Sequence, residues 1–298
     1  MFEAYFGKYL ENQGIITEEQ YQEVVVASQT AKVKLGLLAV AEGFMTEEEA
    51  DEINDAQHKL DKRFGDIAVS RGYLTDSQVE LLLKKQGDSY LLFVQAMVER
   101  NILTLEEIRD YVKEYKRAEK LSDLDVEAIK SGDVDKIIPV LLRNVTISPV
   151  IKDYIALTAR NIGRFIDRQF RIENIEIVDS VGSDFAAAQV LDGDYKIFTG
   201  FFGEGKALKL IAEAYAQEEF EEIDLDVADA TCEFLNCNNG LFATKLSNEY
   251  VDLDMLPPIM RDTYTCIKDD NNIVKVPIYI RDQHVDLVIC RESKWTLE

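Results

Sequence analysis

The sequence predicts an all-helical repeat region followed by an α+β domain. A 29-residue repeat fills the N-terminal third, and from about residue 149 short strand-like apolar runs occur between long helical segments. Long helices grouped against antiparallel strands are typical of an α+β domain. We therefore expect a helical repeat domain at 1–120, a helical linker at 121–148 and an α+β domain at 149–298.

Composition indicates a globular protein that avoids anionic partners. The chain has 298 residues, of which 47% are hydrophobic and 30% charged, and its net charge is -23. Such a surface repels phosphate backbones and anionic membranes, so we expect no nucleic-acid partner. No apolar run reaches the roughly 18 residues that membrane insertion requires, and an acidic residue stands where a signal peptide is basic. We expect a cytoplasmic protein.

Cysteines and histidines give no sign of a metal site. The four cysteines form no CxxC pair, and the two histidines, His58 and His284, lie far apart. In a reducing compartment such cysteines are most simply small core residues. The chain itself is therefore expected to hold neither a metal nor another cofactor.

The repeat has a clear physical logic. Each of the four units has a helix that ends at a residue tolerant of the left-handed conformation, and a threonine then caps the next helix. Three residues later a Gln or Glu completes a capping box. The helix-ending residues are Gly14, Gly43, Gly72 and Asn101; the caps are Thr17, Thr46, Thr75 and Thr104; their partners are Gln20, Glu49, Gln78 and Glu107.

The third unit reads Arg63-Phe-Gly65, Gly72-Tyr-Leu, Val79, Leu83 and Gln86 at fixed spacings. It resembles the N-terminal domain of type II secretion ATPases and the related MshEN domain, some of which bind cyclic di-GMP through two tandem motifs. The resemblance implies that Arg63 and, in the second unit, Lys34 contact the nucleotide. The alternative is a helical docking module without nucleotide.

The second half of the sequence predicts helices and strands in a definite order. A helix begins at Pro149, and strand-like runs begin at Ile175, Phe185 and Tyr195. Helices are expected at 206–216 and 222–246. Further strands are expected at 251–256, 263–267, 274–280 and 284–290.

Gly200 to Lys206 satisfies GxxxxGK, the start of a phosphate-binding loop, between a predicted strand and a predicted helix. Position 207 is Ala, so the hydroxyl that holds magnesium in such loops is absent. A simple strand-to-helix turn explains the glycines better.

The helix predicted at 222–246 presents a polar arc. At 100° per residue, Asp229, Glu233 and Asn236 fall close together. The apolar residues expected to seat the helix on a core are Ile223, Val227, Ala230, Phe234, Cys237 and Leu241. An acid can pair with a cation of a partner, and an Asn can orient a water by hydrogen bonding. The alternative is an ordinary solvated face.

The motif Asp229-x3-Glu233-x2-Asn236 on a long helix, followed by Met255-Leu-Pro-Pro258 after a strand, resembles the CheX, CheC and FliY family of chemotaxis phosphatases. With a single motif the chain is most similar to CheX, which implies a homodimer through the C-terminal domain. The resemblance implies hydrolysis of the aspartyl phosphate on a CheY-like receiver domain, with Mg²⁺ on that partner. Asn236 would orient the attacking water, Glu233 would pair with the receiver's lysine, and Asp229 would support this face.

Two functional hypotheses follow from these patterns. The first is a CheX-like phosphatase joined to a helical docking or regulatory module. The second is a non-catalytic signalling scaffold that binds a receiver and senses cyclic di-GMP through its N-terminal repeats. Glu233 and Asn236 distinguish the two, because only the enzyme needs them for loss of phosphate.

Overall fold

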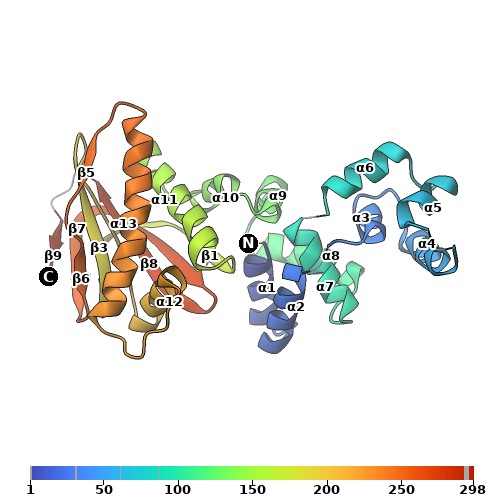
Figure 1. Cartoon of the computed structure of the whole chain (residues 1–298), viewed down its shortest axis with the longest axis horizontal. Helices are drawn as coiled ribbons and strands as arrows, with labels where there is room; N and C mark the ends of the chain where they lie inside the picture. Colours follow the sequence, from blue (N-terminus) through green and yellow to red (C-terminus); the bar gives the residue numbers. More distant parts are fainter. Residues whose placement is uncertain (1, 31, 61, 87, 292–294) are drawn as a thin grey trace. The chain divides into compact units, whose positions relative to one another are not determined.

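The computed structural model describes residues 2–30, 32–60, 62–86, 88–291 and 295–298. The chain divides into two compact units, Met1–Gly132 and Asp133–Glu298 (Figure 1). This division lies inside the range 121–148 in which the sequence predicts a linker. The range contains α9 (Asp123–Ser131) in unit 1 and α10 (Val134–Leu141) in unit 2. None of the described helices is long and apolar enough to cross a membrane.

Among the described residues of unit 1, the regular elements are all helices. Before α9 it contains α1 (Phe2–Asn12), α2 (Glu18–Thr30), α3 (Leu35–Ala41), α4 (Glu47–Leu60), α5 (Phe64–Ser70), α6 (Asp76–Lys84), α7 (Ser89–Glu99) and α8 (Leu105–Ala118). Each even-numbered helix from α2 to α8 follows a threonine whose backbone N–H donates to the Gln or Glu three residues later, and whose hydroxyl accepts that residue's backbone N–H. All four predicted capping boxes are therefore present.

The predicted helix-ending residues adopt the left-handed conformation. Gly14, Gly43 and Gly72 have φ of 68°, 72° and 78°, and Asn101 has φ of 53°. In this region a side chain carries a steric cost that Gly avoids and Asn tolerates. Spacing and residue type thus set the turns within these helix pairs.

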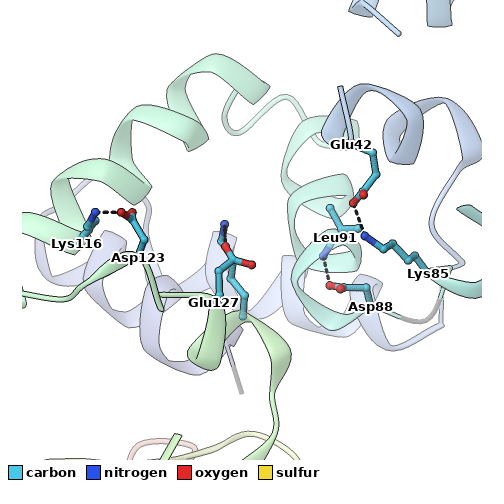
Figure 2. Close-up of polar contacts among 8 residues, drawn as sticks. Glu42, Lys85, Asp88, Leu91, Lys116, Asp123 and Glu127 are labelled. Carbon is cyan, nitrogen blue, oxygen red and sulfur yellow. Dashed lines mark hydrogen bonds and ion pairs between the residues drawn. The ribbon is translucent and has the colours of Figure 1, made fainter. Parts of the chain in front are cut away.

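Polar side chains make local contacts inside unit 1 (Figure 2). Lys85 Nζ lies 2.7 Å from Glu42 Oε1, and Lys116 forms an ion pair with Asp123 at the start of α9. Asp88 caps α7 by accepting the Leu91 N–H at 3.1 Å. Exposed ion pairs contribute at most about 1 kcal/mol each, so buried apolar side chains provide most of the stability.

Unit 2 is an α+β domain. Its helices are α10, α11 (Pro149–Asn161), the π-helical turn η1 (Ile162–Ile166), α12 (Gly205–Ala216) and α13 (Leu225–Ser247). Its strands are β1 (Phe170–Ile172), β2 (Glu176–Ser183), β3 (Phe185–Gly193), β4 (Ile197–Gly203), β5 (Leu253–Met255), β6 (Ile259–Arg261), β7 (Thr265–Ile280), β8 (Gln283–Arg291) and β9 (Thr296–Leu297). The strands pair antiparallel in the order β1-β7-β8-β4-β3-β5, with β2 and β9 also on β7 and β6 also on β3.

Strand β3 shows how the sheet separates two cores. Its residues Ala186, Ala188 and Val190 belong to a buried apolar cluster against which Trp295 packs. Side chains alternate along a strand, so Ala187, Gln189 and Leu191 face the opposite side. That side packs against α12 and α13, and Figure 1 shows α13 running across the strands. A polar residue at 189 is therefore buried beneath α13.

Several predicted boundaries are wrong. The two strands expected at 263–267 and 274–280 are joined in one long strand, β7, whose polar middle bulges, because Lys268 pairs with Ser180 and Ile273 with Val178. The strand expected at 251–256 shortens to β5, and the helix expected at 222–246 runs from Leu225 to Ser247. Strands β1, β6 and β9 have only two or three residues, too few to show an alternating pattern.

The GxxxxGK segment is a strand end and not a phosphate-binding loop. Gly200 to Gly203 belong to β4 and pair with both β3 and β8. Their backbone N–H and C=O groups are therefore used in hydrogen bonds to the neighbouring strands and cannot surround a phosphate. A Cβ at position 200 would lie 2.7 Å from the Cβ of Ala188, which explains the glycine by close strand packing.

Candidate functional site

Helix α13 carries the three residues of the predicted motif. Asp224 caps it by accepting the Asp226 N–H at 3.0 Å, which satisfies one free donor of the first turn. Its buried side chains are Val227, Ala228, Thr231, Cys232, Phe234, Leu235, Asn238, Asn239, Phe242 and Leu246. The helix is therefore seated along its whole length.

The buried face differs from the apolar flank predicted from the sequence. Ile223 precedes the helix and is 38% exposed, and Leu241 is 46% exposed. Asn238 and Asn239 occupy buried positions instead. The prediction of the buried face used apolar residues alone. It therefore missed two Asn side chains that are buried because they have hydrogen-bond partners.

Asp229, Glu233 and Asn236 are all exposed. Their spacing of four and three residues places them on one face of α13. The structure thus leaves all three available to a partner. Two of them, Asp229 and Glu233, also line one surface depression.

The carboxamide of Asn236 is held from below by Gln189 of β3. Gln189 is 2% exposed, and its Nε2 donates to Asn236 Oδ1 at 3.0 Å. The same Nε2 donates to the backbone oxygen of Leu256, also at 3.0 Å. Asn236 is therefore accessible to a partner while its carboxamide oxygen is anchored to the sheet.

Asn239 extends this contact into the interior. Its Nδ2 donates to Gln189 Oε1 at 2.8 Å and to Thr199 Oγ1 at 3.2 Å, and its Oδ1 accepts the Tyr154 hydroxyl at 2.6 Å. Asn238 forms a second buried set, accepting from Asn161 at 2.8 Å and donating to Thr158 at 3.0 Å. Buried amides with complete hydrogen bonding fix one arrangement of the helices and strands around them.

The depression beside Asp229 and Glu233 is acidic. Its volume is about 450 Å³, and it is lined by Tyr215, Ala216, Glu218, Phe220, Asp226, Asp229, Ala230 and Glu233. Burial, and after it the neighbouring Cys237 and Glu233, raise the pKa of Tyr215 to about 12, so this phenol stays neutral at physiological pH. The lining therefore suits a cationic side chain.

The two buried cysteines, Cys232 and Cys290, are not activated nucleophiles. Burial, with the charge of Asp229 next, raises the pKa of the Cys232 thiol to about 12. Burial does the same for Cys290, followed by Asp269. A nucleophilic cysteine needs a lowered pKa. Among the described residues, no group of three or more His, Cys, Asp or Glu side chains is arranged to hold a metal ion.

Of the two predicted nucleotide-binding residues, one lines the cavity described in unit 1. Lys34 lines a cavity of about 240 Å³, and Arg63 is exposed at the start of α5 and does not line it. Lys34 Nζ lies 2.6 Å from Glu99 Oε1, and Glu47 and Asp51 also line the cavity. With its one lysine paired, this lining repels a phosphodiester.

Sequence reasoning did not identify Gln189 as part of the site. The signal was present: a single polar residue interrupts the apolar strand run Phe-Ala-Ala-Ala-Gln189-Val-Leu. A buried polar side chain needs a partner, so such an interruption indicates either a bulge or a hydrogen-bonded site. The partner itself was not predictable, because it lies 47 residues away on α13.

No protein-family model matches this chain, and no curated protein does. Solved structures similar to its C-terminal half include CheX from Desulfovibrio desulfuricans, with 13% identity, a TM-score of 0.41, and coverage of 49% of this chain and 100% of that one. A CheC-like superfamily protein from Shewanella sp. PV-4 has 16% identity, a TM-score of 0.41, and coverage of 49% and 99%.

A third similar structure is the CheX–CheY–BeF3–Mg²⁺ complex from Borrelia burgdorferi, with 14% identity, a TM-score of 0.41, and coverage of 48% and 97%. These three structures are of CheX or CheC-like proteins. Their similarity to this chain lies in its C-terminal half, which carries α13. What α13 can do is inferred below from its own residues.

Proposed function

We propose that unit 2 is a CheX-like phosphatase that hydrolyses the aspartyl phosphate of a CheY-type receiver domain. One observation supports this most directly. Asn236 is exposed on α13 while its carboxamide oxygen is fixed by Gln189, and Glu233 stands one turn before it on the same face. A fixed carboxamide beside an exposed acid is suited to insertion into a partner's phosphorylated site.

The reaction requires little chemistry from this chain. A receiver carries its own Mg²⁺ and lysine around the acyl phosphate, so the missing component is a positioned water. Attack by the water forms a new P–O bond, breaks the bond to the aspartate oxygen, and releases phosphate together with a free carboxylate. The proton lost by the water leaves with phosphate or solvent. Positioning alone can account for large rate effects.

Asn236 has the hydrogen-bonding capacity to hold that water. Gln189 uses one lone pair of Oδ1, so the carboxamide keeps a second lone pair and its two N–H groups for other partners. Since the oxygen is already anchored, binding does not need to freeze a freely rotating side chain. The water can then be held in line with the P–O bond that breaks.

Glu233 and Asp229 supply the docking charge. Glu233 pairs with the receiver's lysine, and Asp229 supports the same face one turn earlier. Both carboxylates lie at the acidic depression described above. Complementary charge of this kind guides association and fixes the register of the complex.

The test is the loss of phosphate from a CheY-type receiver phosphorylated with acetyl phosphate in the presence of Mg²⁺. The parent protein should accelerate this loss, and Asn236→Ala should abolish the acceleration. Thr244→Ala is the matched control, because Thr244 is exposed on the same helix and its hydroxyl bonds only to the Gly240 carbonyl, at 2.8 Å. If no variant differs from the parent, and the parent binds the receiver without accelerating the loss, the scaffold hypothesis replaces this one.

We further propose that unit 1 is a docking or regulatory module for this phosphatase. Its capped helix pairs form a self-contained body with its own apolar core. The acidic surroundings of Lys34 favour a protein partner over cyclic di-GMP. Absence of cyclic di-GMP binding by the parent supports this reading, and binding that is lost in Arg63→Ala would favour the MshEN-like nucleotide sensor.

A further inference from the structure

We infer that Gln189 is a positioning residue that sets both the place and the orientation of the Asn236 carboxamide, an inference that rests on the proposed phosphatase function. Gln189 comes from the sheet and Asn236 from the helix that lies over it. No motif connects the two residues. Their contact exists only in the fold, at 3.0 Å between Gln189 Nε2 and Asn236 Oδ1.

The orientation of both amides follows from a backbone carbonyl. The Leu256 oxygen can only accept, so the Gln189 atom 3.0 Å from it must be the NH2 group. That NH2 group is also the one facing Asn236, so Asn236 must present its oxygen to it. The NH2 group of Asn236 is consequently the end turned away from the sheet. One fixed carbonyl thus determines which way the exposed amide points.

Gln189 is itself prevented from turning. Its Oε1 accepts from Asn239 Nδ2 at 2.8 Å, and Asn239 Oδ1 accepts the Tyr154 hydroxyl at 2.6 Å. All three side chains are buried. Rotation of the Gln189 amide would place oxygen against oxygen at Leu256 and nitrogen against nitrogen at Asn239. Such mismatched buried groups cost the full desolvation of each, so the arrangement is held in one state.

The consequence for the reaction is a carboxamide that is ordered before the receiver arrives. An exposed Asn that rotates freely would populate several rotamers and both orientations of its amide. Misplacement by about 1 Å can cost about a hundredfold in rate, so anchoring matters for the chemical step. Gln189 does not reach the phosphate itself and acts only through Asn236.

The activity test uses Gln189→Leu in the full-length protein. We expect kcat to fall about tenfold to a hundredfold, because only positioning is lost. KM and the affinity for a beryllofluoride-loaded receiver should stay within about twofold, because the docking charges remain. An unchanged kcat, or a loss confined to KM, would overturn the inference.

Thr231→Val controls for general loss of stability. It removes a buried hydroxyl of α13 that donates to the backbone oxygens of Leu208 and Val227, outside the chain of contacts that holds Asn236. If Thr231→Val lowers kcat as much as Gln189→Leu at equal thermal stability, Gln189 has only a structural role. If Gln189→Leu does not fold, Gln189→Met is the second variant, because its unbranched side chain fills similar space and donates no hydrogen bond to Asn236 or Leu256.

A measurement on the parent tests the anchoring without any activity. Nuclear magnetic relaxation of side-chain amides should show the Asn236 NH2 group to be as ordered as those of buried Asn238 and Asn239, and more ordered than that of exposed Asn248. Equal mobility of Asn236 and Asn248 would refute the positioning role. Order at Asn236 without any acceleration of phosphate loss would instead refute the proposed function and leave the anchoring in place.

Discussion

The Tyr154 hydroxyl of α11 donates a hydrogen bond of 2.6 Å to Oδ1 of Asn239 on α13. Both side chains are buried, and the ring of Tyr154 packs edge-on against Phe242 at 5.0 Å between ring centres. This contact joins α11 to the helix that carries the candidate site. Because Asn239 also holds Gln189, the phenol supports the chain of hydrogen bonds that ends at Asn236.

Removal of this hydroxyl should destabilise the domain. Tyr154→Phe leaves the ring in place and deprives Asn239 Oδ1 of its shortest bond. We expect the free energy of unfolding to fall by about 1–3 kcal/mol in urea denaturation, the cost of an under-satisfied buried polar group. Tyr250→Phe is the control, because Tyr250 is 95% exposed, and it should leave stability unchanged. Equal stability of the two variants would contradict this account.

Stability should also fall at alkaline pH. Burial raises the pKa of Tyr154 from 10.0 to about 12 in the folded protein. A group with a raised folded-state pKa keeps its proton more strongly when folded, so its contribution is complete below pH of about 10 and is lost as pH rises toward about 12. Urea midpoints at pH 9 and 11 should therefore drop more for the parent than for Tyr154→Phe. Identical drops would show that Tyr154 does not contribute.

Glu233→Gln should weaken receiver binding with little change in fold. The side chain is exposed, and the substitution removes only its charge. Loss of a paired charge at an interface typically costs about 2 kcal/mol or more, so the dissociation constant for a beryllofluoride-loaded receiver should rise at least about tenfold. Added salt should narrow the difference between parent and variant. Glu249→Gln, an exposed acid beyond the end of α13, is the control and should bind like the parent.

The Cys232 thiol should resist alkylation in the folded protein. With its pKa raised to about 12, mainly by burial, it carries almost no thiolate at pH 8. Iodoacetamide should therefore modify Cys232 at least about a hundredfold more slowly in native protein than in urea, as peptide mass spectrometry would show. Cys290 has the same shift for the same first reason and should behave alike. Rapid modification of Cys232 in the native protein would mean that the packing around this thiol opens in solution.

Local patterns in the sequence predicted the parts of this structure that local forces determine. The capping threonines and left-handed glycines of unit 1 occupy the predicted places, because a cap and its partner lie three residues apart. The exposed arc of Asp229, Glu233 and Asn236 was likewise predictable, since helical spacing alone places these residues together.

Features that depend on distant contacts were not predictable. Nothing near Asn236 in the sequence indicates that Gln189 is its partner. The partners of Asn239 likewise come from β3, β4 and α11, which are distant from it in the sequence. Leu241 is exposed, whereas Asn238 and Asn239 are buried with hydrogen-bond partners. Hydrophobic periodicity contains no information on such polar pairings.

The most direct test of the central claim is the number of turnovers. The full-length protein is added at one-hundredth of the concentration of a Mg²⁺-loaded, acetyl-phosphate-labelled CheY-type receiver, and the inorganic phosphate released beyond the spontaneous rate is counted per protein molecule. We expect many equivalents for the parent and none for Asn236→Ala. Release of at most one equivalent by the parent, or the same release by Asn236→Ala, would contradict this expectation.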